Sequence, residues 1–289
     1  MKVNKYIYLL ALTIASFSWN GCDLFDEEEP IPSYLYIDGM DLNTSSITEG
    51  SNQHDIKDAW ISVNGEFIGV YPIPALVPVL ETDVQQVRIF PGITANGLSN
   101  FRITNPFYTF YEKDIDLESG KIDTITPAVA YDDNNVFLLV EDFETSNLMT
   151  FDVDGSTQTK VTAKTTDVFE GTKSGEIELT SSNGFLEVGS NLIYEIPNPE
   201  YVYLEVHHKN EVSLEFGLIS YKDNAPFEKQ YVAGVFPSDE WQKIYIDITN
   251  DVKLMQTNGG DEFRLVIRAL YTGDDNTYIY LDNIKLIYQ

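Results

Sequence analysis

Polar and aromatic side chains recur at every second position in four runs of the C-terminal half of the chain. In the run YVYLEVHH, Val202, Leu204 and Val206 fall on one face, because successive side chains of a strand point to opposite faces. The same split recurs in residues 212–216, 243–248 and 263–268. The opposite faces carry eight side chains that could hold a ligand: Tyr203, Glu205, His207, Glu215, Tyr245, Asp247, Arg264 and Arg268.

These residue types suit the binding of a sugar or a peptide. Aromatic rings stack on the C–H faces of sugar rings, and carboxylate, imidazole and guanidinium groups form hydrogen bonds with hydroxyl groups. We therefore predict that the eight residues are ligand-binding residues. The alternative is a solvated sheet face with cross-strand ion pairs, for example between Glu215 and an arginine.

The elements that position these residues are almost all strands. Short alternating runs are broken by Asn, Asp, Gly, Ser and Pro, and no window has a sustained helical period. Asn64-Gly65 between two such runs predicts a type I′ hairpin, which requires positive φ at both positions. The sequence predicts an all-β protein with a small β-sandwich at residues 34–131, a polar boundary, and a second sandwich at residues 136–289.

The N-terminus has the pattern of an export signal. Lys2 and Lys5 precede an apolar segment, residues 7–17, that is too short to span a bilayer. Gly21-Cys22 then resembles the cleavage site of bacterial lipoprotein signal peptides, so residues 1–21 are the predicted signal and Cys22 the predicted lipidation site. Cleavage by an ordinary signal peptidase, which would leave Cys22 as a free thiol, is the alternative.

Five acidic residues follow the only cysteine, within a predicted tether at residues 22–33. The acidic run resembles the signal that sends lipoproteins of the Bacteroidetes group to the cell exterior, and it would be a solvated tether in any case. The resemblance implies a lipid-anchored outer-membrane protein that faces outward. Without residues 1–21, which contain two lysines and no acids, 16 basic and 46 acidic side chains remain. This surface excludes nucleic acid as a partner and leaves the lipid anchor as the contact with membrane.

Four motifs occur in order in the C-terminal part: VEDFE at 140–144, VFEGTKSGEIEL at 168–179, DEWQKIYIDIT at 239–249 and YIYLDNIKL at 278–286. Their order resembles jelly-roll carbohydrate-binding modules of the galactose-binding-like type, which implies a jelly roll that binds glycan. Residues 55–120 resemble the PEGA-type, immunoglobulin-like domains of bacterial surface proteins, although the tetrapeptide that names that family is absent. That resemblance implies a spacer.

The jelly-roll resemblance also implies a structural calcium ion between the first and last strands. Asp142, Glu144 and Asp282 match the family's acidic positions there, and Ca²⁺ prefers clustered oxygen ligands. The alternative is that Asp282 only caps a strand end.

Catalysis has little support in the sequence. No G-x-S-x-G, H-E-x-x-H or phosphate-binding loop occurs, and the three histidines include an adjacent pair that points to opposite faces of one strand. We therefore expect a non-catalytic surface lipoprotein that binds glycan. A structural or adhesion protein of the envelope, with a protein partner, is the alternative, and a glycoside-active enzyme is the third hypothesis.

Overall fold

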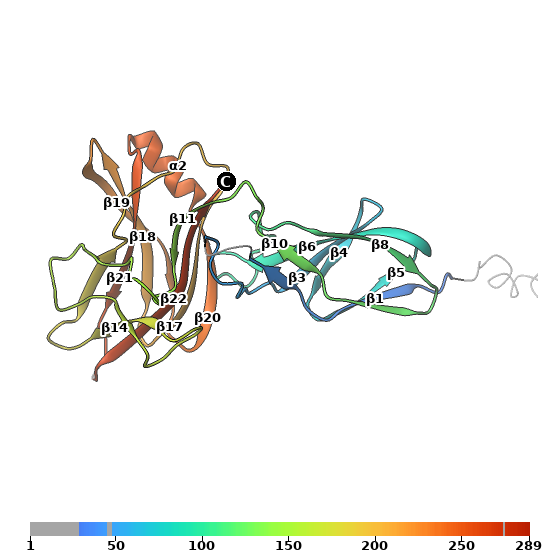
Figure 1. The fold of residues 1–289 in the computed structure, drawn as a ribbon, viewed down its shortest axis with the longest axis horizontal. Coiled ribbons are helices and arrows are strands. Elements are labelled where there is room, and N and C mark those ends of the chain that lie inside the picture. Colours follow the sequence, from blue (N-terminus) through green and yellow to red (C-terminus); the bar gives the residue numbers. More distant parts are fainter. Residues whose placement is uncertain (1–28, 45–47, 274) are drawn as a thin grey trace, which may run out of the picture.

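The structure is a computed structural model that describes residues 29–289 except 45–47 and 274. The predicted signal peptide, Cys22 and most of the acidic run lie outside the described residues. Within these residues, no helix is long and apolar enough to cross a membrane. The described chain is almost all β, which confirms the predicted fold class, and it forms two sandwiches arranged end to end (Figure 1).

Within the described residues, ten strands build the N-terminal sandwich. One sheet has the order β5-β1-β9, a second has the order β4-β3-β6-β7 with β8 beside β6, and β10 pairs with β2. Asn64 and Gly65 join β3 to β4 with φ angles of 50° and 83°, which confirms the predicted hairpin. The strand bounds are β1 Ser33–Ile37, β2 Asp41–Asn43, β3 Asp58–Val63, β4 Glu66–Pro72, β5 Ala75–Val79, β6 Asp83–Thr94, β7 Arg102–Thr104, β8 Tyr111–Leu117, β9 Ile122–Ile125 and β10 Ala128–Ala130.

The C-terminal sandwich has two six-stranded sheets. The proximal sheet, which faces the N-terminal sandwich, has the order β13-β14-β22-β17-β20 with β11 beside β22 (Figure 1). The distal sheet has the order β12-β15-β21-β18-β19 with β16 beside β21. The bounds are β11 Val136–Glu141, β12 Phe151–Asp152, β13 Thr162–Lys164, β14 Ser174–Leu179, β15 Phe185–Gly189, β16 Tyr194–Glu195, β17 Val202–Asn210, β18 Leu214–Lys222, β19 Ala225–Val235, β20 Ser238–Asp247, β21 Glu262–Leu270 and β22 Thr277–Tyr288.

The alternation seen in the sequence places the apolar faces of the two sheets against each other. Val202, Leu204 and Val206 of β17 are buried in the core between the sheets, together with Leu265 and Ile267 of β21. One apolar face from each sheet makes the core of a β-sandwich, because the opposite face of each strand points away from it.

One helix, α2 at Thr249–Asn258, was not expected from the sequence. It follows β20 and ends at Gly259, whose φ of 109° allows the left-handed cap. Its buried face is only Thr249, Val252 and Met255. A single short apolar stripe of this kind is too weak a periodic signal to separate a helix from a loop.

The two sandwiches share a buried aromatic cluster. Phe107, Tyr108 and Tyr131 of the N-terminal part contact Tyr203 and Tyr245 of the proximal sheet. The backbones also meet, since the amide of Asn96 donates to the carbonyl of Tyr245 over 2.7 Å. The outer face of the proximal sheet at β17 and β20 is therefore a packed interface.

Candidate functional site

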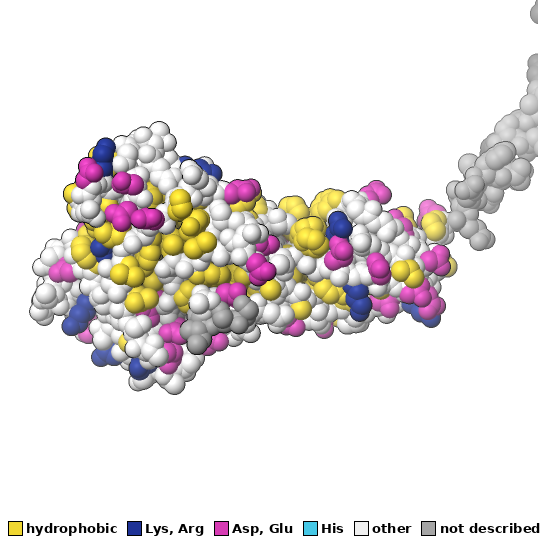
Figure 2. Space-filling model, turned by 45° about the horizontal axis from the view of Figure 1, so that its top comes forward, with side chains coloured by type: hydrophobic (Ala, Val, Ile, Leu, Met, Phe, Trp, Pro, Cys, Tyr) yellow, Lys and Arg dark blue, Asp and Glu magenta, His cyan; other side chains and the backbone are white. Residues whose placement is uncertain are grey.

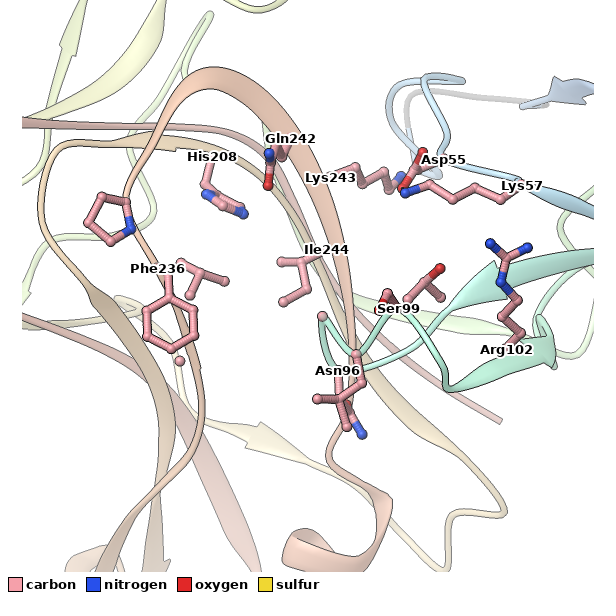
Figure 3. Close-up of a pocket in the computed structure, with 16 residues that line it drawn as sticks. Asp55, Lys57, Asn96, Ser99, Arg102, His208, Phe236, Gln242, Lys243 and Ile244 are labelled. Atoms are coloured by element: carbon pink, nitrogen blue, oxygen red, sulfur yellow. The ribbon is translucent and has the colours of Figure 1, made fainter. Parts of the chain in front are cut away.

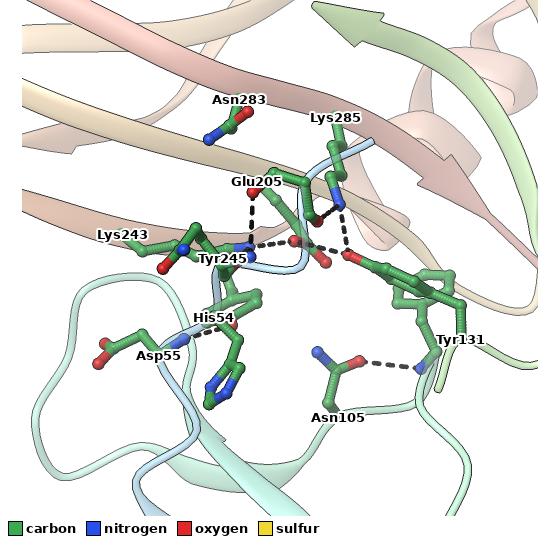
Figure 4. Close-up of polar contacts among 12 residues, drawn as sticks. His54, Asp55, Asn105, Tyr131, Glu205, Lys243, Tyr245, Asn283 and Lys285 are labelled. Atoms are coloured by element: carbon green, nitrogen blue, oxygen red, sulfur yellow. Dashed lines mark hydrogen bonds and ion pairs between the residues drawn. The ribbon is translucent and has the colours of Figure 1, made fainter. Parts of the chain in front are cut away.

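Three of the predicted ligand-binding residues lie inside the interface between the sandwiches, and Figure 4 shows two of them, Glu205 and Tyr245. Tyr203, Glu205 and Tyr245 are at most 2% exposed. The Glu205 carboxylate lies 2.7 Å from Nζ of Lys243 and accepts a hydrogen bond of 3.1 Å from the Tyr131 hydroxyl. These side chains hold the two sandwiches together. The sheet face on which we predicted ligand binding is therefore covered at these three positions.

Lys285 extends the same buried network. Its Nζ donates to the carbonyl of Ser51 over 2.6 Å and to the Tyr131 hydroxyl over 3.1 Å. Burial lowers the pKa of Lys285 to about 8, and the nearby Glu205 opposes this shift. The interface thus contains two ammonium groups and one carboxylate away from water.

His207 and Asp247 border the interface. The His207 ring stacks on Phe169 at 4.0 Å, and burial lowers its pKa to about 2, so it is neutral. Asp247 is half-buried, and its carboxylate accepts the amide N–H of Thr249 at the start of α2. Neither side chain is presented as a free ligand-binding group.

A pocket of about 370 Å³ lies at the edge of the interface (Figure 3). Phe236 lies at one end and Arg102 at the other, with Gln242 and Ile244 of β20 between them. Its cations already have partners: Lys57 lies 3.0 Å from Asp55, Arg102 contacts Asp58, and Lys243 contacts Glu205.

Glu215, Arg264 and Arg268 lie together on the outer face of the distal sheet. Glu215 of β18 is directly opposite Arg268 of β21, and the two side chains form an ion pair at 2.6 Å. This confirms the cross-strand ion pair between Glu215 and an arginine. The eight predicted residues are therefore divided between the outer faces of two different sheets.

Aromatic rings accompany these arginines. The Arg264 guanidinium lies 3.7 Å from the ring centre of Phe151, and the Arg268 guanidinium lies 3.9 Å from that of Tyr231. Such cation–π contacts hold both groups in fixed positions. Tyr231 can lie close to the sheet because residue 217 is glycine: a Cβ there would be 2.3 Å from the carbonyl oxygen of Gln230 and 2.9 Å from the Tyr231 ring.

A groove of about 410 Å³ runs beside these residues. Its floor is Ile219 and Tyr221 of β18, which are nearly buried. Its sides are Phe151 of β12 and Phe227 of β19, which are 39% and 47% exposed. The groove therefore offers aromatic surface to a ligand from both sides.

Glu187 of β15 forms the polar centre of this face. Its carboxylate accepts hydrogen bonds of 2.7 and 2.9 Å from Lys229 and one of 2.5 Å from the Tyr231 hydroxyl. Burial acts to raise the pKa of Glu187, but Lys229 and Tyr231 outweigh it and lower the pKa, so the carboxylate is ionised. We define the distal groove as the apolar groove together with the adjoining polar residues: Phe151, Glu187, Glu215, Tyr221, Phe227, Lys229, Tyr231, Arg264 and Arg268.

Sequence reasoning identified three members of the distal groove and missed the others. Phe151 stands in a two-residue strand, and Phe227 stands at an irregularity in the pairing of β18 with β19. Neither belongs to a clean alternating run, so periodicity could not place them on this face. The aromatic residues of β19 and of the connection between β11 and β13 are the sequence signal that could have indicated these members of the distal groove.

Each of the three predicted calcium ligands already accepts hydrogen bonds from backbone N–H groups. Burial raises the pKa of Asp282 to about 7, and Glu170 and Asp142 add to the shift. The Glu144 carboxylate accepts backbone N–H groups of Thr172 and Lys173 at 2.6 and 2.8 Å. In the described part of the chain, no three His, Cys, Asp or Glu side chains are placed to hold one ion together. Asp282 accepts the backbone N–H groups of Glu170 and Asn283, and the Glu144 contacts close a loop, so calcium binding stays a prediction.

No family model and no curated protein matches the chain. It is similar to a solved structure of carbohydrate-binding modules from the β-sandwich superfamily, with 14% identity and a TM-score of 0.40 over 79% of this chain and 84% of that one. It is also similar to the family 30 carbohydrate-binding module of a cellulosomal cellulase of Clostridium thermocellum, with 16% identity and a TM-score of 0.40 over 53% and 96%. The xylan-binding domain CBM22-1 from Paenibacillus barcinonensis has 16% identity and a TM-score of 0.33 over 53% and 95%. These are likenesses only, and the fold assignment rests on the sheets described above.

Proposed function

We propose that the protein is a non-catalytic glycan-binding protein and that the distal groove is its binding site. The observation that carries the proposal is the pair of exposed rings, Phe151 and Phe227, on either side of a groove next to fixed polar groups. Rings supply stacking surface, and Glu187, Lys229 and Arg268 supply planar or charged groups for sugar hydroxyls. Because these groups are already held by one another, little side-chain entropy is lost on binding.

The test is affinity electrophoresis of the full chain against neutral polysaccharides. We expect Phe227→Ala to weaken binding at least tenfold, which is about 1.4 kcal/mol. Phe101→Ala is a matched control, because Phe101 is 44% exposed on the N-terminal sandwich, away from the groove. If Phe227→Ala and Phe101→Ala bind alike, the distal groove is not the site.

The state of Glu187 supports a non-catalytic role. A glycosidase needs one carboxyl group with a raised pKa as general acid and a second carboxylate at a suitable distance. Glu187 is instead ionised and bound to Lys229. A glycoside-active enzyme is therefore the weaker hypothesis.

A protein partner is the second candidate. Hydrophobic side chains gather over the C-terminal sandwich in the view of Figure 2, with acidic side chains scattered over both sandwiches. Phe236 is 86% exposed at the interface pocket. If the partner is a protein, the parent should not bind polysaccharide, and Phe236→Ala should weaken capture of an envelope protein.

We further propose that Cys22 is acylated and anchors the chain at the outer membrane, facing the exterior. The sequence motif and the acidic run carry this proposal. The described chain begins at the end of the N-terminal sandwich far from the C-terminal sandwich (Figure 1), so an anchor there would leave the distal groove accessible. Cys22→Ala should release the protein from the membrane fraction, and retention of that variant without a lipid mass would contradict the assignment.

A further inference from the structure

A row of aromatic rings lies on the outer face of the proximal sheet. The ring centres of Phe169 and Trp241 are 5.6 Å apart, those of Trp241 and Tyr280 are 6.4 Å apart, and those of Tyr280 and Tyr278 are also 6.4 Å apart. All four side chains are half-buried, so each keeps part of its surface in solvent. We call these four residues the aromatic row.

The register of β22 explains why the row faces outward. Thr277, Ile279 and Leu281 are buried toward the core, so Tyr278 and Tyr280 point to the other face. The rings are thus additional to the core between the sheets. None of the four rings of the aromatic row belongs to the aromatic cluster that joins the two sandwiches.

Polar contacts fix the position of the row. Asp167 accepts a hydrogen bond of 2.8 Å from the indole N–H of Trp241 and one of 2.6 Å from Lys209. Lys209 is directly opposite Tyr280 in the sheet. The Tyr278 hydroxyl donates to Glu178 over 3.4 Å. The rings are therefore held in place by their neighbours.

A polar trough of about 400 Å³ lies one strand away. It is lined by Lys160, Thr162, Lys164, Glu176 and Glu178 among others. The residues of β14 in this trough pair directly with the row, since Glu176 is opposite Tyr280 and Glu178 is opposite Tyr278. The carboxylates of β14, the tyrosine rings of β22 and the ammonium group of Lys209 on β17 therefore lie on three neighbouring strands.

We infer that the aromatic row and the trough form a second glycan-binding face, separate from the distal groove. The occupant is a neutral chain of pyranose sugars: rings in a row match successive C–H faces, and mixed carboxylates and ammonium groups match hydroxyls. The carboxylates Asp167, Glu176 and Glu178 disfavour nucleic acid, whose phosphates they would repel. The inference uses none of the residues of the distal groove.

Two faces on one sandwich have a measurable consequence. A polysaccharide with many repeats can engage both, directly or through neighbouring molecules, and the second contact then benefits from a high effective concentration. A short oligosaccharide can fill only one face at a time. Loss of one face should therefore weaken binding to the polymer more than binding to the oligosaccharide.

The test uses the full chain, with hydroxyethylcellulose, xylan and galactomannan as probes in affinity electrophoresis. In the Phe227→Ala background, the double change Tyr278→Ala and Tyr280→Ala should remove the remaining retardation by at least one probe. Tyr36→Ala is the control, since Tyr36 is an exposed tyrosine of β1 on the N-terminal sandwich. Melting curves within a few degrees of the parent would show that the variants are folded.

The outcomes separate the two sites. Loss of binding on changing Tyr278 and Tyr280, with Phe227→Ala equal to the parent, supports the aromatic row and rejects the distal groove. Equal retardation with and without the tyrosine changes overturns the aromatic row, whatever Phe227→Ala does. Absence of retardation of the parent by every probe also overturns it.

Discussion

Replacing Glu205 by glutamine should destabilise the protein more than removing the carboxylate charge from any other ion pair among the described residues. Glu205 and Lys243 form an ion pair in which the two side chains are 0% and 2% exposed. The variant would leave the Lys243 ammonium buried without its carboxylate partner, 2.8 Å from the carbonyl oxygen of Gln53, and with Lys285 as a second buried ammonium. Breaking a buried pair from one side costs about 3–5 kcal/mol, because the remaining charge is uncompensated.

The measurement is unfolding by urea and by heat at pH 7. At about 2–4 °C per kcal/mol, the expected loss lowers the melting temperature by roughly 6–20 °C. Glu112→Gln is the matched control, because its pair with Arg88 has side chains 38–39% exposed, and such pairs contribute at most about 1 kcal/mol. Adding Lys243→Met to Glu205→Gln should recover part of the loss, since it removes the stranded charge. If Glu205→Gln costs no more than Glu112→Gln, the interface is hydrated and the reasoning from burial is wrong.

Three further predictions concern other parts of the chain. Burial holds the pKa of His207 near 2, so below pH 6.5 only the unfolded state binds a proton at this residue. The free energy of unfolding should therefore fall by about 1.4 kcal/mol between pH 7.5 and 5.5 because of His207. Urea unfolding of His207→Gln should lack this part of the pH dependence. If Asp282 holds calcium, chelation should lower the melting temperature of the parent but not of Asp282→Asn. Bound calcium would stabilise the folded state by about 2.7 kcal/mol when its concentration is a hundredfold above the dissociation constant. Identical melting curves of the parent with and without chelator would reject the calcium site. Gly217→Ala places a Cβ 2.3 Å from a carbonyl oxygen, so we expect it to displace β19, destabilise the protein by roughly 1–3 kcal/mol and weaken glycan binding. Gly39→Ala, with open space around it, should keep full binding.

Alternation predicted the two-sheet organisation well, because burial of one face is a local property of each strand. Val202, Leu204 and Val206 point into the core as expected, and Asn64-Gly65 forms the expected turn. These features depend only on the period of two and on backbone preferences, which short sequence windows contain.

The environment of the opposite faces could not be predicted in the same way. Tyr203 and Glu205 alternate with apolar residues just as Glu215 does, yet the first two are buried by a distant part of the chain and Glu215 is open to the solvent. Which face another sandwich covers depends on contacts between residues more than 70 positions apart, such as Tyr131 with Glu205. The distal groove likewise joins β12 to β19, which no periodic pattern connects.

The pairing of β1 determines how the N-terminal sandwich would respond to tension. β1 runs parallel to β9, with Tyr34 opposite Ile122 and Ile37 opposite Ile125, and the chain leaves β9 through β10 toward the C-terminal sandwich. A pull on an N-terminal anchor acts at the start of β1, whereas a pull on a bound glycan acts beyond the end of β9. The two neighbouring strands are then loaded in shear, so their evenly spaced hydrogen bonds must yield together instead of one after another. An anchored molecule would therefore bear flow or drag along its length through a strand pair in the geometry that resists separation best.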